Sequence, residues 1–257
     1  MHACRLSALE PQTWLVIAGF FIIVILQNMA QQYPDSQPEY PEECQTLSDL
    51  GFDIIPFIGV TWLSESGSDL NSVADIWIVT SIVITVLLFL FVFPYPQLLF
   101  RRFLICYGSV FALRALTVMA TVYPRLPFKS ENFVSSNPLW GAFLILAGAR
   151  TTARDMMFSG HTSGFILCAS FVSHYTSSRL FAIIFWVYNV LGALSLIAVR
   201  EHYTADVLVA VIISRLIFFL YHVVIEYVPV RAKKRYYMFR LWFYLDHSET
   251  ERYKCSI

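Results

Sequence analysis

Six long apolar segments constrain this chain more than any other feature of its sequence. A helix needs roughly 20 mostly apolar residues to cross the ~30 Å hydrocarbon core of a bilayer. Open sheet edges cannot satisfy their backbone hydrogen bonds in lipid, so the sequence predicts an all-α polytopic membrane protein with six transmembrane helices. The six segments run approximately over residues 14–30, 75–93, 103–123, 158–175, 180–199 and 205–228.

Composition supports membrane insertion and argues against several other functions. Apolar residues make up 57% of the 257 residues and charged residues only 14%. The formal net charge is zero, so there is no basic field to attract nucleic acid, and no nucleic-acid partner is predicted. The five cysteines have neither the spacing of metal ligands nor the density of a disulfide scaffold. We therefore expect no structural metal.

The chain is expected to form one membrane domain over residues 1–257, with a basic cytoplasmic tail at 229–257. The first apolar segment could alternatively be a signal peptide, but Asn28 and Ala30 form a poor cleavage site, which favours an uncleaved anchor. The apolar stretch 137–149 is too short to span and fits an interfacial or re-entrant position.

The distribution of charge in the loops predicts the orientation. Residues 31–74 contain eight acidic residues and no Lys or Arg, whereas Arg101 and Arg102 fill the expected second loop and five basic residues at 231–240 follow the last span. The positive-inside rule therefore places both termini in the cytoplasm. A seventh span would put the basic tail outside. The loops that share the opposite face are then 31–74, 124–157 and 200–204.

Two polar stretches at the ends of apolar helices could carry chemistry: ARDMMFSGHTSGF at 153–165 and REHYTADVLVA at 200–210. His202 and Asp206 are four residues apart at a helix start, which places them on one face. The carboxylate can orient one imidazole nitrogen and leave the other to attack phosphorus, giving a phosphohistidine intermediate.

His161 is the candidate acid and base for this chemistry. It lies on the same predicted membrane face, where it would protonate a departing lipid alkoxide and later deprotonate an incoming hydroxyl. Ser159 and Gly160 permit close backbone approach, and the following helix offers N–H groups to phosphate, so no metal is required. Taken singly, His161, His202 and Asp206 equally fit helix capping at the interface. Their coincidence on one face favours catalysis.

These two stretches resemble the signature motifs of the sphingomyelin synthase family, a branch of the phosphatidic acid phosphatase type 2 (PAP2) superfamily. The stretch RRFLICYGSVFALRALTVMATVYPRLP at 101–127 is similar to the family's third-span motif, and HYTADVLVAVIISRLIFFLYHVV at 202–224 follows the family pattern. LSDLGFDIIP at 47–56 is loosely similar to a Pro/Asp motif. The resemblance covers roughly 101–224 and the six-span layout.

The resemblance implies a PAP2-like bundle that moves phosphocholine or phosphoethanolamine from a glycerophospholipid to ceramide. The implied partners are phosphatidylcholine or phosphatidylethanolamine, ceramide and diacylglycerol, with no cofactor and no indicated oligomeric state. His202 matches the nucleophile, Asp206 its orienting carboxylate and His161 the acid and base. Asp155 matches the aspartate of the family's Cys-Gly-Asp element, in which Ala153 and Arg154 replace the first two residues.

Four arginines and one tyrosine are further candidates for substrate contacts. Arg154 and Arg200 could clamp phosphate, although Arg154 could equally repel a quaternary ammonium. Tyr203 offers an aromatic face to such a group. Arg114 and Arg215, inside the third and sixth spans, require a partner or a water-filled cavity and sit below the expected catalytic face.

Two other functions compete with the transferase. A lipid phosphate phosphatase or phospholipase C-like hydrolase would use water as acceptor, but Leu196 stands where the superfamily's phosphatases carry an Arg. A non-catalytic lipid-binding protein would not need His161, His202 and Asp206 together. The resemblance implies a lumenal or exoplasmic active site in the Golgi or plasma membrane, with the endoplasmic reticulum as a third compartment.

Overall fold

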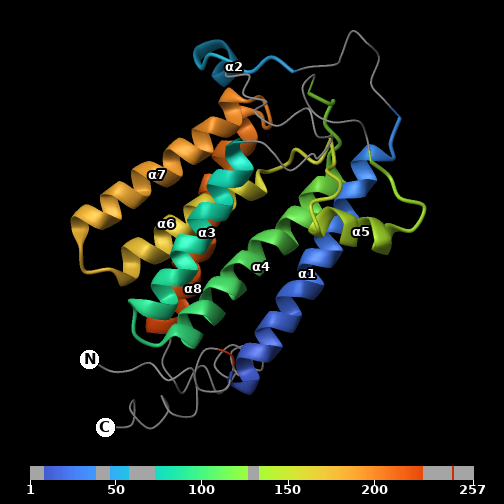
Figure 1. Cartoon of the computed structure of the whole chain (residues 1–257). Coiled ribbons are helices and arrows are strands. Elements are labelled where there is room, and N and C mark those ends of the chain that lie inside the picture. Colours follow the sequence, from blue (N-terminus) through green and yellow to red (C-terminus); the bar gives the residue numbers. More distant parts are fainter. Residues whose placement is uncertain (1–8, 39–46, 58–72, 127–132, 228–244, 246–257) are drawn as a thin grey trace.

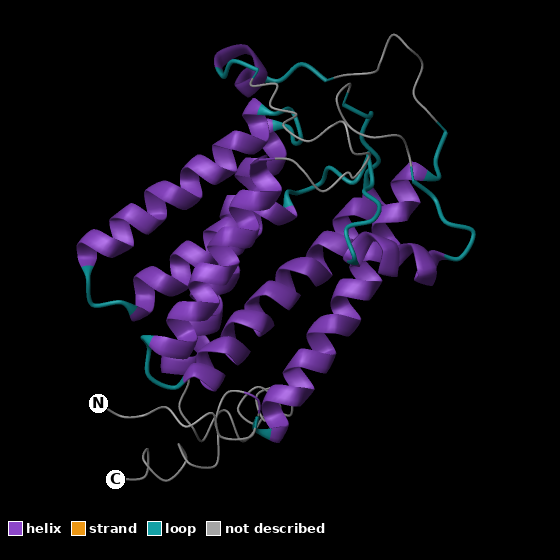
Figure 2. Ribbon diagram, viewed as in Figure 1, coloured by secondary structure: helices purple, strands orange, loops and turns teal. Residues whose placement is uncertain are grey.

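All regular elements in the described part of the chain are helices (Figures 1 and 2). The computed structural model describes residues 9–38, 47–57, 73–126, 133–227 and 245, so the predicted tail at 229–257 lies outside the described residues except for Leu245. The helices are α1 (Pro11–Asp35), α2 (Leu50–Ile54), α3 (Val73–Phe91), α4 (Pro96–Ala120), α5 (Pro138–Leu146), α6 (Gly160–Tyr175), α7 (Arg179–Ala198) and α8 (Thr204–Tyr227).

Five of these helices are long and apolar enough to cross a membrane: α1, α3, α4, α7 and α8. The protein is therefore a multi-pass helical membrane protein, as the sequence predicts. The expected fourth span corresponds to α6, whose 16 residues give a length of about 24 Å at the usual helical rise. A sixth crossing stays a prediction.

Helix α6 forms the centre of the bundle. Every residue from Thr162 to Val172 is buried, because α3, α4, α7 and α8 all pack around this helix (Figure 1). Gly192 on α7 permits one close contact, since a Cβ there would lie 2.7 Å from the ring of Phe165 on α6. A helix shielded in this way contacts protein rather than lipid over most of its length.

Helix α4 corrects the expected position of two arginines. The sequence placed Arg101 and Arg102 in a loop before a span at 103–123, but α4 begins at Pro96 and contains both residues. Arg101 is buried in the helix because its guanidinium donates to Glu10 at 2.6 Å and to Thr13 at 3.2 Å. A buried charge needs such partners, and only tertiary structure supplies them.

The short apolar stretch at 137–149 contains helix α5, which does not span. Asn137 caps this nine-residue helix by accepting from the main-chain N–H groups of Leu139 and Trp140. Helix α5 packs on α1 and exposes Trp140 and Phe143. It accounts for the hydropathy peak without a seventh crossing.

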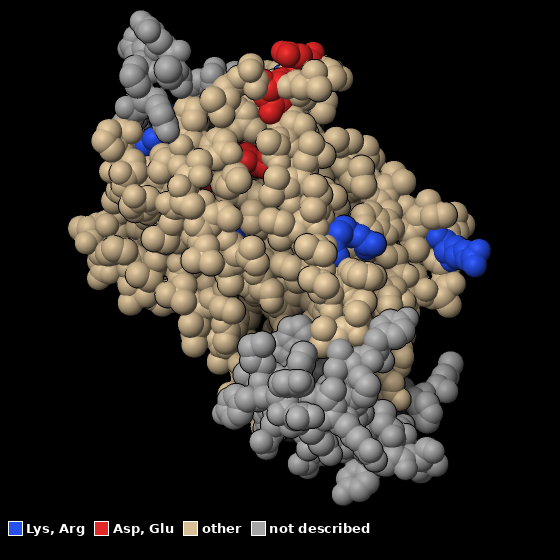
Figure 3. Space-filling model, turned by 180° about the vertical axis from the view of Figure 1, so that it is seen from behind, with Lys and Arg blue, Asp and Glu red and all other residues tan. Residues whose placement is uncertain are grey.

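The described parts of the three loops that the charge pattern predicted to share a face lie at one end of the bundle. Gln31 at the end of α1 donates to Asp155 before α6, and Arg200 after α7 donates to carbonyls of the segment that contains α2. Figure 1 places α2 and α5 at this end. Figure 3 shows that the flank of the bundle is largely uncharged and that acidic side chains gather toward this same end. We call this end of the bundle the site end.

Phe171 tests the importance of the packing around α6. Its fully buried ring meets Phe89, Phe103 and Phe218 edge-on, so Phe171→Ala should lower the free energy of unfolding by about 3–5 kcal/mol. Denaturant titration of the purified protein in detergent measures this loss. Phe219→Ala is the matched control, because Phe219 is 61% exposed on α8. Equal losses in both variants would contradict a core centred on α6.

Candidate functional site

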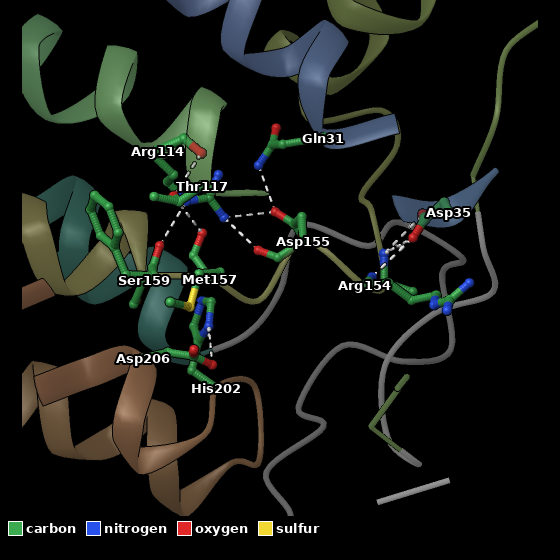
Figure 4. A network of polar contacts seen from close by, with 12 residues as sticks. Gln31, Asp35, Arg114, Thr117, Arg154, Asp155, Met157, Ser159, His202 and Asp206 are labelled. Atoms are coloured by element: carbon green, nitrogen blue, oxygen red, sulfur yellow. Dashed lines mark hydrogen bonds and ion pairs between the residues drawn. The ribbon is translucent and has the colours of Figure 1, made fainter. Parts of the chain in front are cut away.

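A main-chain hydrogen bond joins the two polar stretches found in the sequence. Ser159 is the N-cap of α6, where its side chain accepts from Thr162 N at 3.2 Å. Its own N–H donates to the Asp206 carbonyl at 3.3 Å, on the first turn of α8. The start of α6, which carries His161, is thereby held against the start of α8, which carries Asp206 (Figure 4).

His202 and Asp206 form a buried pair in the turn that leads into α8. His202 Nδ1 lies 3.8 Å from Asp206 Oδ2, and the two side chains are 5% and 0% exposed. This is the distance of an ion pair, and catalytic pairs commonly tighten to hydrogen-bond length around substrate. Tyr203 N donates to the same Oδ2 at 3.2 Å and fixes the carboxylate. With Nδ1 facing Asp206, Nε2 lies on the opposite side of the imidazole ring.

His161 has an acidic partner that sequence reasoning missed. Its Nε2 lies 2.8 Å from Asp75 Oδ1, in the first turn of α3. Since a carboxylate only accepts, the proton between them belongs to Nε2, which leaves Nδ1 to face a substrate. Asp75 is an acidic residue at the start of a predicted span, on the same predicted face as His161, and this placement is the signal that could have identified it.

The two histidine pairs differ in their access to solvent. The His161 and Asp75 side chains are 34% and 26% exposed, whereas His202 and Asp206 are almost completely buried. An exposed imidazole can exchange protons with water, while a buried one is protected from competing reaction with it. This difference suits an acid and base at His161 and a nucleophile at His202.

Arg114 holds the loop that precedes α6. Its guanidinium donates to the Asp155 carboxylate and carbonyl, both at 2.8 Å, and to the Phe158 carbonyl at 2.8 Å (Figure 4). Gln31 donates to the same carboxylate at 2.6 Å. The sequence placed Arg114 below the catalytic face, which is wrong, because α4 ends at Ala120 and brings this side chain to the site end. Asp155 is therefore the partner that a buried arginine requires.

Arg215 is also paired between helices. It donates to Ser170 Oγ at 2.9 Å and lies 5.5 Å from the Trp186 ring centroid. These contacts join α8 to α6 and α7.

Arg154 points away from the pair of His202 and Asp206 (Figure 4). Its buried guanidinium donates to main-chain carbonyls of Tyr123, Pro34, Gln37 and Pro38. The main-chain N–H groups of Ala153 and Arg154 meanwhile donate to Asp35, at the end of α1. This geometry ties the loop before α6 to α1, and it does not support the phosphate-clamp role expected for Arg154.

Arg200 is likewise engaged by the protein. It donates to the carbonyls of Phe52 at 2.7 Å and Ile55 at 3.1 Å, and its guanidinium lies 4.3 Å from the Phe52 ring centroid. This arrangement does not support a phosphate clamp at Arg200 either. Tyr203 is buried between the rings of Phe52 and Tyr123, at centroid distances of 5.5 and 5.9 Å. Its ring faces are covered, so an ammonium-binding role for Tyr203 is not supported.

Two phenols beside Asp206 are held neutral. Burial raises the pKa of Tyr203, and the charges of Asp206 and Asp49 add to this effect, while the Leu47 N–H opposes it. Burial also raises the pKa of Tyr123, with Asp206 again adding to it. A raised phenol pKa means that both groups stay protonated at physiological pH. They therefore add no negative charge beside Asp206.

Gly160 begins α6 without a steric need for glycine. A Cβ there would lie 3.6 Å from Arg114 Nε, which is ordinary contact. The expected approach of substrate to the backbone at Ser159 and Gly160 stays a prediction.

The comparisons with known proteins match the segment that contains this candidate site. The family model described as PAP2 superfamily C-terminal matches residues 153–223, which include both polar stretches. Sphingomyelin synthase-related protein 1 of Homo sapiens is 28% identical over 94% of this chain and 59% of its own length. Sphingomyelin synthase-related 1 of Caenorhabditis elegans is 28% identical over 87% of this chain and 45% of its own length.

A further relative is named for a transferase. Phosphatidylcholine:ceramide cholinephosphotransferase 1 of Homo sapiens is 27% identical over 58% of this chain and 40% of its own length. The chain thus spans about half the length of these relatives. These matches support the resemblance to the PAP2 superfamily, whose family model matches residues 153–223. The relatives carry names of the sphingomyelin synthase family, to which the motifs also pointed.

Arg114→Ala tests the pairing with Asp155. The substitution leaves a buried carboxylate without its cation, so we expect a loss of about 3–5 kcal/mol in unfolding free energy and faster proteolysis of the loop before α6. Thermal unfolding in detergent and limited proteolysis measure both effects. Arg179→Ala, at the exposed first position of α7, is the control. A stable Arg114→Ala protein would show that the pair does not hold the loop.

Proposed function

We propose that this protein transfers a phosphocholine or phosphoethanolamine headgroup from a glycerophospholipid to ceramide, through a phosphohistidine at His202. One observation carries the proposal. Two imidazole–carboxylate pairs, His202 with Asp206 and His161 with Asp75, are held at one end of a membrane bundle by the hydrogen bond between Ser159 and Asp206. Neighbouring nucleophile and acid–base pairs are what a two-step displacement at phosphorus requires.

In the first step His202 Nε2 attacks the phosphorus of the donor lipid. The N–P bond forms while the bond from phosphorus to the glycerol oxygen breaks. Protonated His161 gives its Nδ1 proton to the departing alkoxide, which leaves as diacylglycerol. Asp206 stabilises the positive charge that develops on His202, and Asp75 stabilises the imidazolium of His161 before transfer.

The second step restores both histidines. Neutral His161 takes the proton of the ceramide primary hydroxyl, whose oxygen attacks phosphorus as the N–P bond breaks. The products are the headgroup-bearing sphingolipid and free His202, with His161 again protonated. The burial of His202 supports transfer over hydrolysis, because a shielded phosphohistidine meets less water.

The charges around the site favour a zwitterionic headgroup. Arg114 is bonded to Asp155, and Arg154 and Arg200 donate to main-chain carbonyls. The carboxylates of Asp75 and Asp206 face the two histidines. A headgroup that carries its own ammonium complements such surroundings better than a dianionic phosphate monoester does. This argues for a phosphodiester donor and against a phosphatase.

The relatives support the same chemistry. The printed name of the cholinephosphotransferase specifies phosphatidylcholine as donor and ceramide as acceptor, and the PAP2 match covers His161, His202 and Asp206. The absence of Lys and Arg from the loop 31–74 supports a lumenal or exoplasmic site with cytoplasmic termini. The proposal places this single membrane domain in the Golgi or plasma membrane, or else in the endoplasmic reticulum.

A cellular assay tests the transferase directly. Wild type expressed in cells lacking sphingomyelin synthesis and fed labelled ceramide should yield labelled sphingomyelin or ceramide phosphoethanolamine, resolved by mass spectrometry. His202→Ala should yield neither. His174→Gln, near the opposite end of α6, is the control that retains product formation. A folded wild type that makes no phosphorylated ceramide would reject transfer, and release of free phosphocholine or phosphoethanolamine would indicate hydrolysis.

Asp75→Asn tests the acid–base pair. An amide cannot stabilise the imidazolium of His161, so kcat should fall about 10²–10⁴-fold with little change in KM for the donor lipid. Steady-state kinetics in mixed micelles measure both constants. The side chain is 26% exposed, so the protein should unfold at the wild-type temperature. An unchanged kcat would remove Asp75 from the mechanism.

A further inference from the structure

Helix α2 is fastened at both ends to the turn that carries His202. At its start, Asp49 caps α2 by accepting from Phe52 N at 3.1 Å. The same carboxylate accepts from Thr204 N at 2.8 Å and from Thr204 Oγ1 at 2.5 Å. One side chain therefore caps α2 and also binds the first residue of α8, two residues after His202.

The far end of α2 is held by Arg200. Its guanidinium donates to the carbonyls of Phe52 and Ile55 and covers the Phe52 ring, which also stacks on the Tyr203 ring. Gly51 allows this close approach, since a Cβ there would collide with Thr204 Oγ1. The turn 200–204 is thus bound to α2 through Arg200, Tyr203 and Thr204, with His202 between them.

The backbone of Arg200 indicates that its side chain is important. Helix α7 ends in a Schellman arrangement, with Glu201 N donating to Leu196 O and Arg200 N to Ile197 O. Arg200 occupies the position where glycine is usual, at a φ of 60°, which L residues seldom adopt. An unfavourable backbone conformation at a residue whose guanidinium donates to three carbonyls implies a specific task for that side chain.

We propose that Asp49 and Arg200 are positioning residues that clamp α2 across the catalytic turn and so fix the direction of the His202 imidazole. This inference rests on the proposed role of His202. It assigns a task to the segment 47–56, which the sequence singled out without a function. It also replaces the phosphate contact expected of Arg200, because the guanidinium acts on the turn through α2.

Two substitutions separate positioning from folding. Asp49→Asn keeps a good N-cap for α2 but turns an amide toward Thr204 N–H. Arg200→Gly removes the guanidinium while favouring the backbone at this position. Both should lower kcat about 10–100-fold, with KM for the donor lipid nearly unchanged. Millimolar guanidinium should restore part of the activity of Arg200→Gly alone. Asp53→Asn, on the exposed face of α2, is the matched control.

Hydrogen exchange tests the clamp independently of activity. Amides in the peptide covering 200–206 should exchange faster in Asp49→Asn and Arg200→Gly than in wild type or Asp53→Asn. Unchanged exchange and kcat in both variants would overturn the proposal. A rise in KM with constant kcat in Arg200→Gly would also overturn it and restore the phosphate contact. If wild type proved inactive, the proposed function would fail, while faster exchange in the two variants would still support the clamp.

Discussion

The hydrogen bond from Ser159 N to the Asp206 carbonyl is the contact on which the candidate site depends. It holds the beginning of α6 against the beginning of α8, so that two short polar stretches far apart in the sequence meet at one end of an apolar bundle. The proposed transfer needs both stretches, because its acid–base histidine and its nucleophilic histidine must reach the same phosphorus. Four other helices pack around α6, and this packing holds the contact between α6 and α8 in place.

The arginines of the site end support this contact between α6 and α8. Arg114 and Arg154 bind the loop before α6 to α4 and α1, and Arg200 binds the turn before α8 to α2. A guanidinium suits this work because its planar fork can donate to several carbonyls at once. These cations hold the backbone of the site, and the carboxylates remain beside the histidines. The resulting charge distribution fits a substrate with its own positive group.

The sequence was sufficient for the features that depend on hydropathy and local spacing. It predicted the long helices, the shared end of three loops and the pairing of His202 with Asp206, because a bilayer and a helical period leave few alternatives. It failed for Arg101, whose buried charge is paired with the distant Glu10, and for Arg114, whose partner follows 41 residues later. Asp75 and Asp49 were missed as partners for the same reason: both act on side chains or backbone from distant segments.

The most direct measurement is chemical trapping of the enzyme intermediate. Purified protein would be mixed with a donor lipid radiolabelled in its headgroup phosphate, quenched in alkali without acceptor, digested and mapped. The account predicts label on the peptide that contains His202, loss of that label in His202→Ala, and its discharge when ceramide is added before the quench. Label on His161, or rapid turnover with no labelled protein at any time, would contradict a phosphohistidine at His202.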